Sequence, residues 1–184
     1  MSPVAPTPNF LRNFYALRAG VAAVWVALAF TVGVQNPALG ALLLVLYPAW
    51  DALANLIDAR ANGGLRANLT QTTNLAISLI ATLGMIPGAL SLGIHFMIGV
   101  FGVWAVLAGL FQLLTGLRRW KTAGAQWAMI LSGAQSILAG VFFAIMSRGT
   151  ADLSIATVAG YAGFGAFYFL VSAVWLTFRP RSAG

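Results

Sequence analysis

Two carboxylates within an otherwise apolar stretch are the residues of this sequence whose types and spacing could do chemistry. Asp51 is followed by Asn55 at i+4 and Asp58 at i+7 and preceded by Tyr47 at i−4, so the four side chains share one helix face. At 1.5 Å per residue, Asp51 lies about 12 Å before Ala59, near the end of this apolar segment. A carboxylate at that depth of a membrane costs roughly 2.5–3.5 kcal/mol, so Asp51 should face the bundle interior or water, or be protonated.

This polar face has two interpretations, which the sequence leaves open. It could form an access path for protons or cations, or a hydrogen-bonded strut between helices. Pro48 precedes Asp51 by less than one turn and frees the carbonyl of Leu44. Gln112 and Gln135, from later apolar segments, could complete the polar face, although inward-facing glutamines are also ordinary contacts between membrane helices.

Other functional chemistry has few residues to use. The chain has no cysteine, one histidine and three acidic residues. This composition excludes disulfides and thiolate metal sites and disfavours a zinc or iron centre. No Ser–His–Asp set, phosphate-binding loop or carboxylate pair with an orienting base is evident. We therefore expect no catalytic residue, no metal, no cofactor and no enzymatic activity.

The composition predicts the elements that position these residues. Of the 184 residues, 60% are hydrophobic and only 7% are charged, and the mean hydropathy is +0.89. A soluble domain has roughly 25% charged residues. At about 20 apolar residues per span, the chain has room for six transmembrane helices and little else. The expected fold class is an all-α polytopic membrane protein.

The apolar runs predict six spans, arranged as three helical hairpins. An Asn36-Pro37 turn joins the first two spans, with Asn36 as N-cap and Pro37 as the first helical residue. The hairpins cover about 14–60, 72–117 and 125–178, between a disordered N-terminal tail (1–13) and a C-terminal tail (179–184). The spans are expected at about 14–34, 38–57, 72–86, 94–117, 125–146 and 153–178.

The basic residues predict the orientation of these spans. Nine of the ten lie at the N-terminus, in the 2–3 and 4–5 loops or at the C-terminus, and only Arg148 lies on the other side. The positive-inside rule then places both termini in the cytoplasm. Basic residues at helix ends also meet anionic lipid head groups, so the net charge of +7 does not indicate nucleic acid.

The second helices of the three hairpins share a pattern that suggests an internal repeat. An aromatic residue is followed by leucine three positions later in each, beginning at Trp50, Trp104 and Phe167. A period of roughly 55 to 60 residues suggests threefold duplication of a hairpin. The alternative is that apolar sequences align by chance.

The chain resembles the HdeD-like short-repeat membrane proteins over about residues 15–178. The resemblance rests on the Asn36-Pro37 turn, the glycine- and aromatic-rich segment 102–111 and the Leu131-Ser132-Gly133 opening of the fifth span. It implies a six-helix protein of the bacterial inner membrane with an association with acid stress. It supplies no catalytic or binding residues. Asp51 and Asn55 stand where the second hairpin has alanine and glycine.

Two functional hypotheses follow. The first is a non-enzymatic inner-membrane protein serving acid or envelope stress as an accessory or oligomeric component. The second is a small transporter or channel for protons, cations or a small solute, which uses the polar face around Asp51. The expected partners are membrane lipids, with a homo-oligomer or a larger membrane complex left open and nucleic acid excluded.

Overall fold

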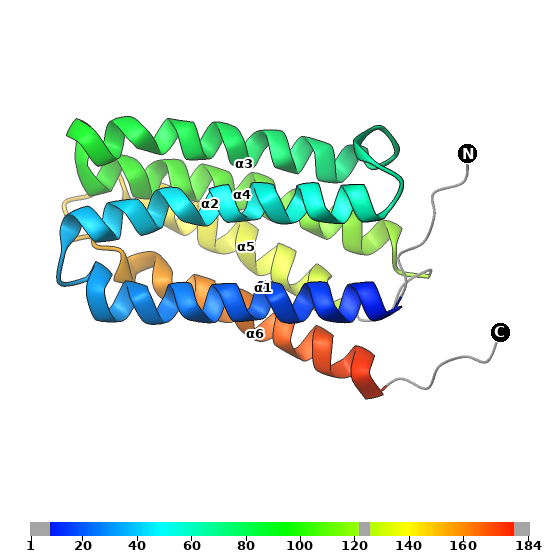
Figure 1. The fold of residues 1–184 in the computed structure, drawn as a ribbon. Helices are drawn as coiled ribbons and strands as arrows, with labels where there is room; N and C mark the ends of the chain where they lie inside the picture. Colours follow the sequence, from blue (N-terminus) through cyan, green and yellow to red (C-terminus); the bar gives the residue numbers. More distant parts are fainter. Residues whose placement is uncertain (1–7, 122–125, 179–184) are drawn as a thin grey trace.

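The computed structural model describes residues 8–121 and 126–178, and these residues form a bundle of six α-helices (Figure 1). A short 3₁₀ turn, Leu65–Ala67, lies between α2 and α3. The π-helical segments Ala29–Gly33 and Gly88–Leu92 extend α1 and α3. The helices are α1 (Pro8–Leu28), α2 (Pro37–Ala61), α3 (Leu69–Pro87), α4 (Gly93–Arg118), α5 (Gln126–Met146) and α6 (Ala156–Phe178).

The surface of this bundle is apolar. Large hydrophobic side chains such as Leu90, Leu138 and Phe178 are 73–81% exposed. Five helical segments of the described residues are long and apolar enough to cross a membrane. One of them, Leu69–Arg118, includes both α3 and α4, which fold back on each other at Gly93, where φ is +78°. The chain is therefore a multi-pass membrane protein, because lipid is the solvent in which such a surface is stable.

The turn between the first two helices is the predicted one. The Asn36 side chain accepts hydrogen bonds from the backbone N–H groups of Ala38 and Leu39, at 3.0 and 3.2 Å. Pro37 is the first residue of α2, where its missing N–H costs nothing. The predicted N-cap is confirmed.

The start of the chain differs from the expectation. α1 begins at Pro8, so residues 8–13 of the predicted tail are helical. The cause is the same preference for proline in a first helical turn. Residues 1–7 and the predicted C-terminal tail 179–184 lie outside the described residues.

The helices pack in three pairs that are offset from the predicted hairpins. The most extensive contacts join α4 to α5, α1 to α6 and α2 to α3, whereas α1 and α2 touch little beyond their connecting turn. Each even-numbered helix thus packs against the next helix, and α6 closes the ring against α1. Because the first hairpin is opened in this way, the face of α2 that carries the carboxylates is turned toward α3 and the bundle interior.

Glycines explain why α4 and α5 form the closest pair. Gly102 and Gly109 on α4 face Gly140 and Gly133 on α5, and both sets are spaced by seven residues. A Cβ on Gly140 would lie 2.5 Å from the carbonyl oxygen of Gly102, and one on Gly109 would lie 2.7 Å from that of Gly133. Small residues at such positions let the two backbones approach closely, which is how membrane helices gain packing energy.

The two ends of the bundle differ in character. We call the end where α2 and α4 finish and α3 begins the basic end, since Arg60, Arg66, Arg118 and Arg119 lie there. α1 also starts and α6 also finishes at this end (Figure 1). Toward the opposite end the interior is an apolar core in which Leu44, Met85, Met97, Ile98 and Val158 are fully buried.

Candidate functional site

A polar cavity occupies the half of the bundle nearest the basic end. Its volume of about 80 Å³ gives room for a few water molecules, since a water takes about 30 Å³ in the liquid. All six helices contribute to its wall, and the side chains include two arginines, two aspartates, several amides and several hydroxyls. A cavity with this lining inside a membrane bundle is a site for water or a polar solute, because lipid could not satisfy its polar groups.

Asp51 is the centre of the first polar network in this wall. Its Oδ1 accepts from the Arg18 guanidinium at 2.6 Å. Its Oδ2 accepts from Asn55 Nδ2 at 3.0 Å, Asn74 Nδ2 at 3.2 Å and Ser78 Oγ at 2.9 Å. Three helices, α1, α2 and α3, therefore converge on one carboxylate, which is only 7% exposed.

Arg18 reaches Asp51 from the α1–α6 pair. Its guanidinium carbon lies 4.3 Å from the ring centroid of Phe169 on α6 and 5.8 Å from that of Phe14 on α1. A cation over aromatic faces keeps its charge while losing water, so these rings help hold a guanidinium within the membrane. Arg18 thus spans the interface between α1–α6 and the rest of the bundle.

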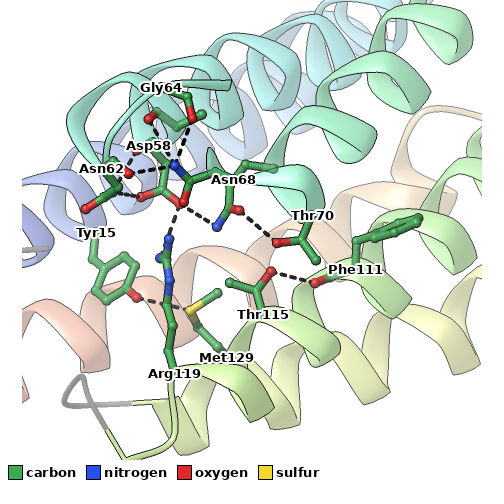
Figure 2. A network of polar contacts seen from close by, with 12 residues as sticks. Tyr15, Asp58, Asn62, Gly64, Asn68, Thr70, Phe111, Thr115, Arg119 and Met129 are labelled. Carbon is green, nitrogen blue, oxygen red and sulfur yellow. Dashed lines mark hydrogen bonds and ion pairs between the residues drawn. The ribbon is translucent and has the colours of Figure 1, made fainter. Parts of the chain in front are cut away.

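Asp58 is the centre of a second network nearer the basic end (Figure 2). Its carboxylate accepts from Asn62 Nδ2 at 2.7 Å, Gln71 Nε2 at 3.1 Å and Arg119 Nη1 at 3.2 Å. Figure 2 shows Arg119 extending from the end of α4 to this carboxylate. Asn68 stabilises the loop between α2 and α3 by donating to the carbonyls of Asn62 and Gly64, at 2.7 and 2.9 Å.

The two ion pairs make the cavity wall electrically balanced. Arg18 pairs with Asp51 and Arg119 pairs with Asp58, with side chains that are 10–16% exposed. An unpaired charge in such a site would be far costlier than a paired one with further hydrogen bonds. The pairing therefore accounts for how α2 tolerates two carboxylates in a membrane segment.

Aromatic side chains close the inner end of the cavity. Tyr47 packs against Trp25, Phe101 and Trp104, with ring centroids 4.7, 5.9 and 5.8 Å apart. Tyr161 packs against Phe101 and makes a hydrogen bond with Ser136. From Asp58 to Tyr47 the helix rises about 16 Å, roughly half of a 30 Å hydrocarbon core. The cavity therefore ends near mid-membrane, and the apolar core lies beyond it.

Trp104 joins this aromatic floor to the Asp51 network. Its indole Nε1–H donates to Ser78 Oγ at 2.9 Å, and that hydroxyl donates in turn to Asp51 Oδ2. On the α1 side, Trp25 Nε1 donates to the carbonyl of Leu43, one residue before the carbonyl that Pro48 frees. Both buried indoles thus have partners and their positions are fixed.

Three polar atoms in the cavity wall have no hydrogen-bond partner among the described residues. They are Arg18 Nε, Asn74 Oδ1 and Gln112 Nε2, and all three are shielded from bulk solvent. A buried polar atom without a partner costs about 1–3 kcal/mol, so such atoms mark positions for water or a ligand. Two of them donate and one accepts.

The structure brings all six sequence-predicted residues to this one cavity. Tyr47, Asn55 and both aspartates line it from α2, Gln112 lines it from α4 and Gln135 lines it from α5. Their use as an ion path remains a prediction.

Sequence reasoning missed the partners of the two carboxylates. Arg18 and Arg119 were assigned to topology alone, although Arg18 falls inside the predicted first span. On α3, Gln71, Asn74 and Ser78 follow at i, i+3 and i+7, which is the polar stripe that would have indicated a partner for α2.

Comparison with known families gives one match. Residues 85–145 match the family described as a short repeat of unknown function (DUF308). This is about a third of the chain and covers the end of α3, the π segment, α4 and almost all of α5. No curated protein and no solved structure matches the chain.

The matched repeat includes the glycine-packed pair α4–α5. The α2–α3 pair differs from it at two aligned positions. With Trp50 aligned on Trp104, Asp51 replaces Ala105, and Asn55 replaces Gly109. Gly109 packs closely against the backbone of Gly133 on α5, whereas Asn55 and Asp51 make hydrogen bonds. Among the described residues, both carboxylates of the polar cavity thus come from α2, which has Asn55 where α4 has the packing residue Gly109.

Proposed function

We propose that this protein is a six-span, non-enzymatic protein of the HdeD-like type in the bacterial inner membrane, with both termini in the cytoplasm. The short-repeat match, the apolar bundle and the cations at one end support this proposal. In this orientation the basic end faces the cytoplasm. The polar cavity then lies in the cytoplasmic half of the bundle, and aromatic side chains close its inner end.

Its function is to admit a small polar solute without net charge to this cavity, as a carrier in an inward-facing state. The observation that carries the proposal is a half-membrane cavity lined by all six helices and closed by Tyr47, Trp104 and Tyr161. A carrier exposes its site to one side at a time, near the bilayer midplane. A purely structural interior would instead be filled by side chains.

The lining favours a neutral or zwitterionic solute over an ion. Arg18 and Arg119 balance the two carboxylates, so a bare cation or anion would meet no net opposite charge. Arg18 Nε and Gln112 Nε2 can donate to a carboxylate or carbonyl group, and Asn74 Oδ1 can accept from an amino or hydroxyl group.

Cysteine labelling tests the cavity directly, because the chain has no native cysteine. Ser132 lines the cavity six residues from the start of α5, and Ser172 is buried outside it six residues from the end of α6. Ser132→Cys should react with a membrane-impermeant, charged thiol reagent from the cytoplasmic side, and Ser172→Cys should not. Equal protection of both cysteines would show that water does not enter the cavity and would reject the proposal.

A second candidate function is an accessory role in acid or envelope stress without transport. The complete hydrogen bonding of Asp51 and Asp58 favours it, since such carboxylates can serve purely as struts between helices. Asp51→Asn in proteoliposomes separates the two. Either role lowers the stability of Asp51→Asn, so the flux decides between them. In a carrier, the folded Asp51→Asn protein loses the solute flux that the wild type shows, whereas in a strut neither protein transports solute. A wild-type protein without flux of neutral solutes or zwitterions would leave only the accessory role.

A further inference from the structure

A groove on the outer side of the bundle is a second site, distinct from the polar cavity. It has a volume of about 550 Å³ and lies between α3, α4 and α5. Most of its lining is apolar, including Ile77, Ile80, Val100 and Leu107. Gly84 leaves open space in the groove, because a Cβ there would have only Val100 within 4 Å. In a membrane such a groove is in contact with lipid.

The polar residues of the groove gather at the end away from the basic end. His95 lies in the first turn of α4, and Ser147 and Arg148 follow the end of α5. His95 Nδ1 lies 3.4 Å from the carbonyl oxygen of Ser147. Arg148 is exposed, and its side chain makes no hydrogen bond or ion pair within residues 8–121 and 126–178. A guanidinium is thus available beside the apolar groove.

The positive end of α4 adds to this local field. The helix has no side-chain cap at its first turn, and the N-terminal N–H groups of a helix carry a partial positive charge. Arg148, His95 and the start of α4 together form a cationic or hydrogen-bonding rim. An anionic group fits this rim better than a neutral one.

The length of the groove matches one leaflet of a bilayer. From His95 to Leu107 the helix rises about 18 Å, and half of the hydrocarbon core measures about 15 Å. With His95 and Arg148 at head-group level, the apolar part therefore runs toward the bilayer centre along the path of an acyl chain.

We propose that the groove binds one anionic phospholipid from the leaflet at the Arg148 end. Its phosphate contacts Arg148 and His95, and one acyl chain lies between α3 and α4 over Gly84 and Gly99. This site is independent of the solute cavity, with which it shares only Trp104 among its lining residues.

Native mass spectrometry of the full-length protein with phosphatidylglycerol or phosphatidylcholine of the same acyl chains tests the head-group contact. One basic residue at a membrane surface contributes about 1 kcal/mol, so we expect about fivefold tighter binding of phosphatidylglycerol. Arg148→Gln should abolish this preference, and Arg66→Gln, which removes the same charge at the basic end, should preserve it. Equal binding of both lipids by the wild type, or equal losses in the two variants, would overturn the proposal.

Filling the groove tests the acyl-chain contact. A Cβ on Gly84 would meet only Val100, at 3.7 Å, so Gly84→Leu extends into the groove without a backbone clash. Gly160 on α6 has nothing within 4 Å of such a Cβ, so Gly160→Leu is the matched control. Gly84→Leu should weaken the binding of both lipids about tenfold, and Gly160→Leu should not.

Equal lipid binding by these two glycine variants would show that the lipid lies elsewhere. If Gly84→Leu does not elute as the wild type in size-exclusion chromatography, Val103→Trp replaces it. Val103 lines the groove and is 56% exposed, so the fold tolerates a larger side chain there. Unchanged lipid binding by that variant would equally overturn the proposal.

Discussion

The ion pair between Arg18 and Asp51 makes the sharpest prediction about this fold. Asp51→Asn keeps the size of the side chain but leaves the Arg18 guanidinium without its counter-charge. Arg18→Gln likewise leaves the Asp51 carboxylate without its counter-charge. Removing one partner of a buried ion pair costs about 3–5 kcal/mol, because the remaining charge stays desolvated.

The structure places the expected cost at the lower end of that range. The Arg18 and Asp51 side chains retain 16% and 10% exposure and border a cavity with room for water, which can solvate part of the remaining charge. We expect about 3 kcal/mol for each single variant. The double variant Arg18→Gln/Asp51→Asn should lose no more than about 3 kcal/mol rather than 6, because it leaves no unpaired charge, so the coupling is at least about 3 kcal/mol.

Reversible unfolding in mixed detergent micelles measures these free energies. Arg60→Gln is the control, since Arg60 is exposed on the same helix as Asp51 and should change stability by no more than about 0.5 kcal/mol. Additive losses in the double variant would refute the reasoning, because the pair would then contribute no interaction energy of its own.

Three further predictions concern packing, capping and the hydrogen-bond network. Gly140→Leu should cost about 3 kcal/mol or more in the same unfolding assay, because its Cβ would lie 2.5 Å from the α4 backbone, whereas Gly160→Leu should change little. Asn36→Ala should cost about 1 kcal/mol by removing the N-cap of α2, and no loss would argue against that cap. Trp104→Phe should cost about 1 kcal/mol by leaving the Ser78 hydroxyl without its donor, and combining it with Ser78→Ala should cause less additional loss than Ser78→Ala alone.

Much of the candidate site follows from helix periodicity. Tyr47, Asp51, Asn55 and Asp58 are spaced to share a face, and their place along one cavity wall agrees with that spacing. The side chains that pair with the two aspartates could not be predicted from the sequence. Arg18 is 33 residues from Asp51 and Arg119 is 61 residues from Asp58, and no local rule pairs residues at such separations.

The start of α2 was predictable for a different reason. Asn36 and Pro37 act through their own backbone and the next turn, so their effect is encoded locally. The extension of α1 to Pro8 follows the same local preference of proline. By contrast, the hairpin model did not foresee the offset pairs, because glycines spaced by seven residues indicate a close contact without saying which helix provides it.

The amino-acid sequence alone determines that this chain dissolves in lipid as apolar helices and that one of them carries a polar face, since hydropathy, charge and helical period are properties of neighbouring residues. Only the tertiary structure decides that α1 opens away from α2, that two arginines neutralise the carboxylates and that all six helices surround a half-membrane cavity. The physical reason is that burial, ion pairing and cavities arise between segments that are far apart in the chain. Glycines such as Gly109 and Gly140 allow two backbones to approach, and this determines which helices can pack closely.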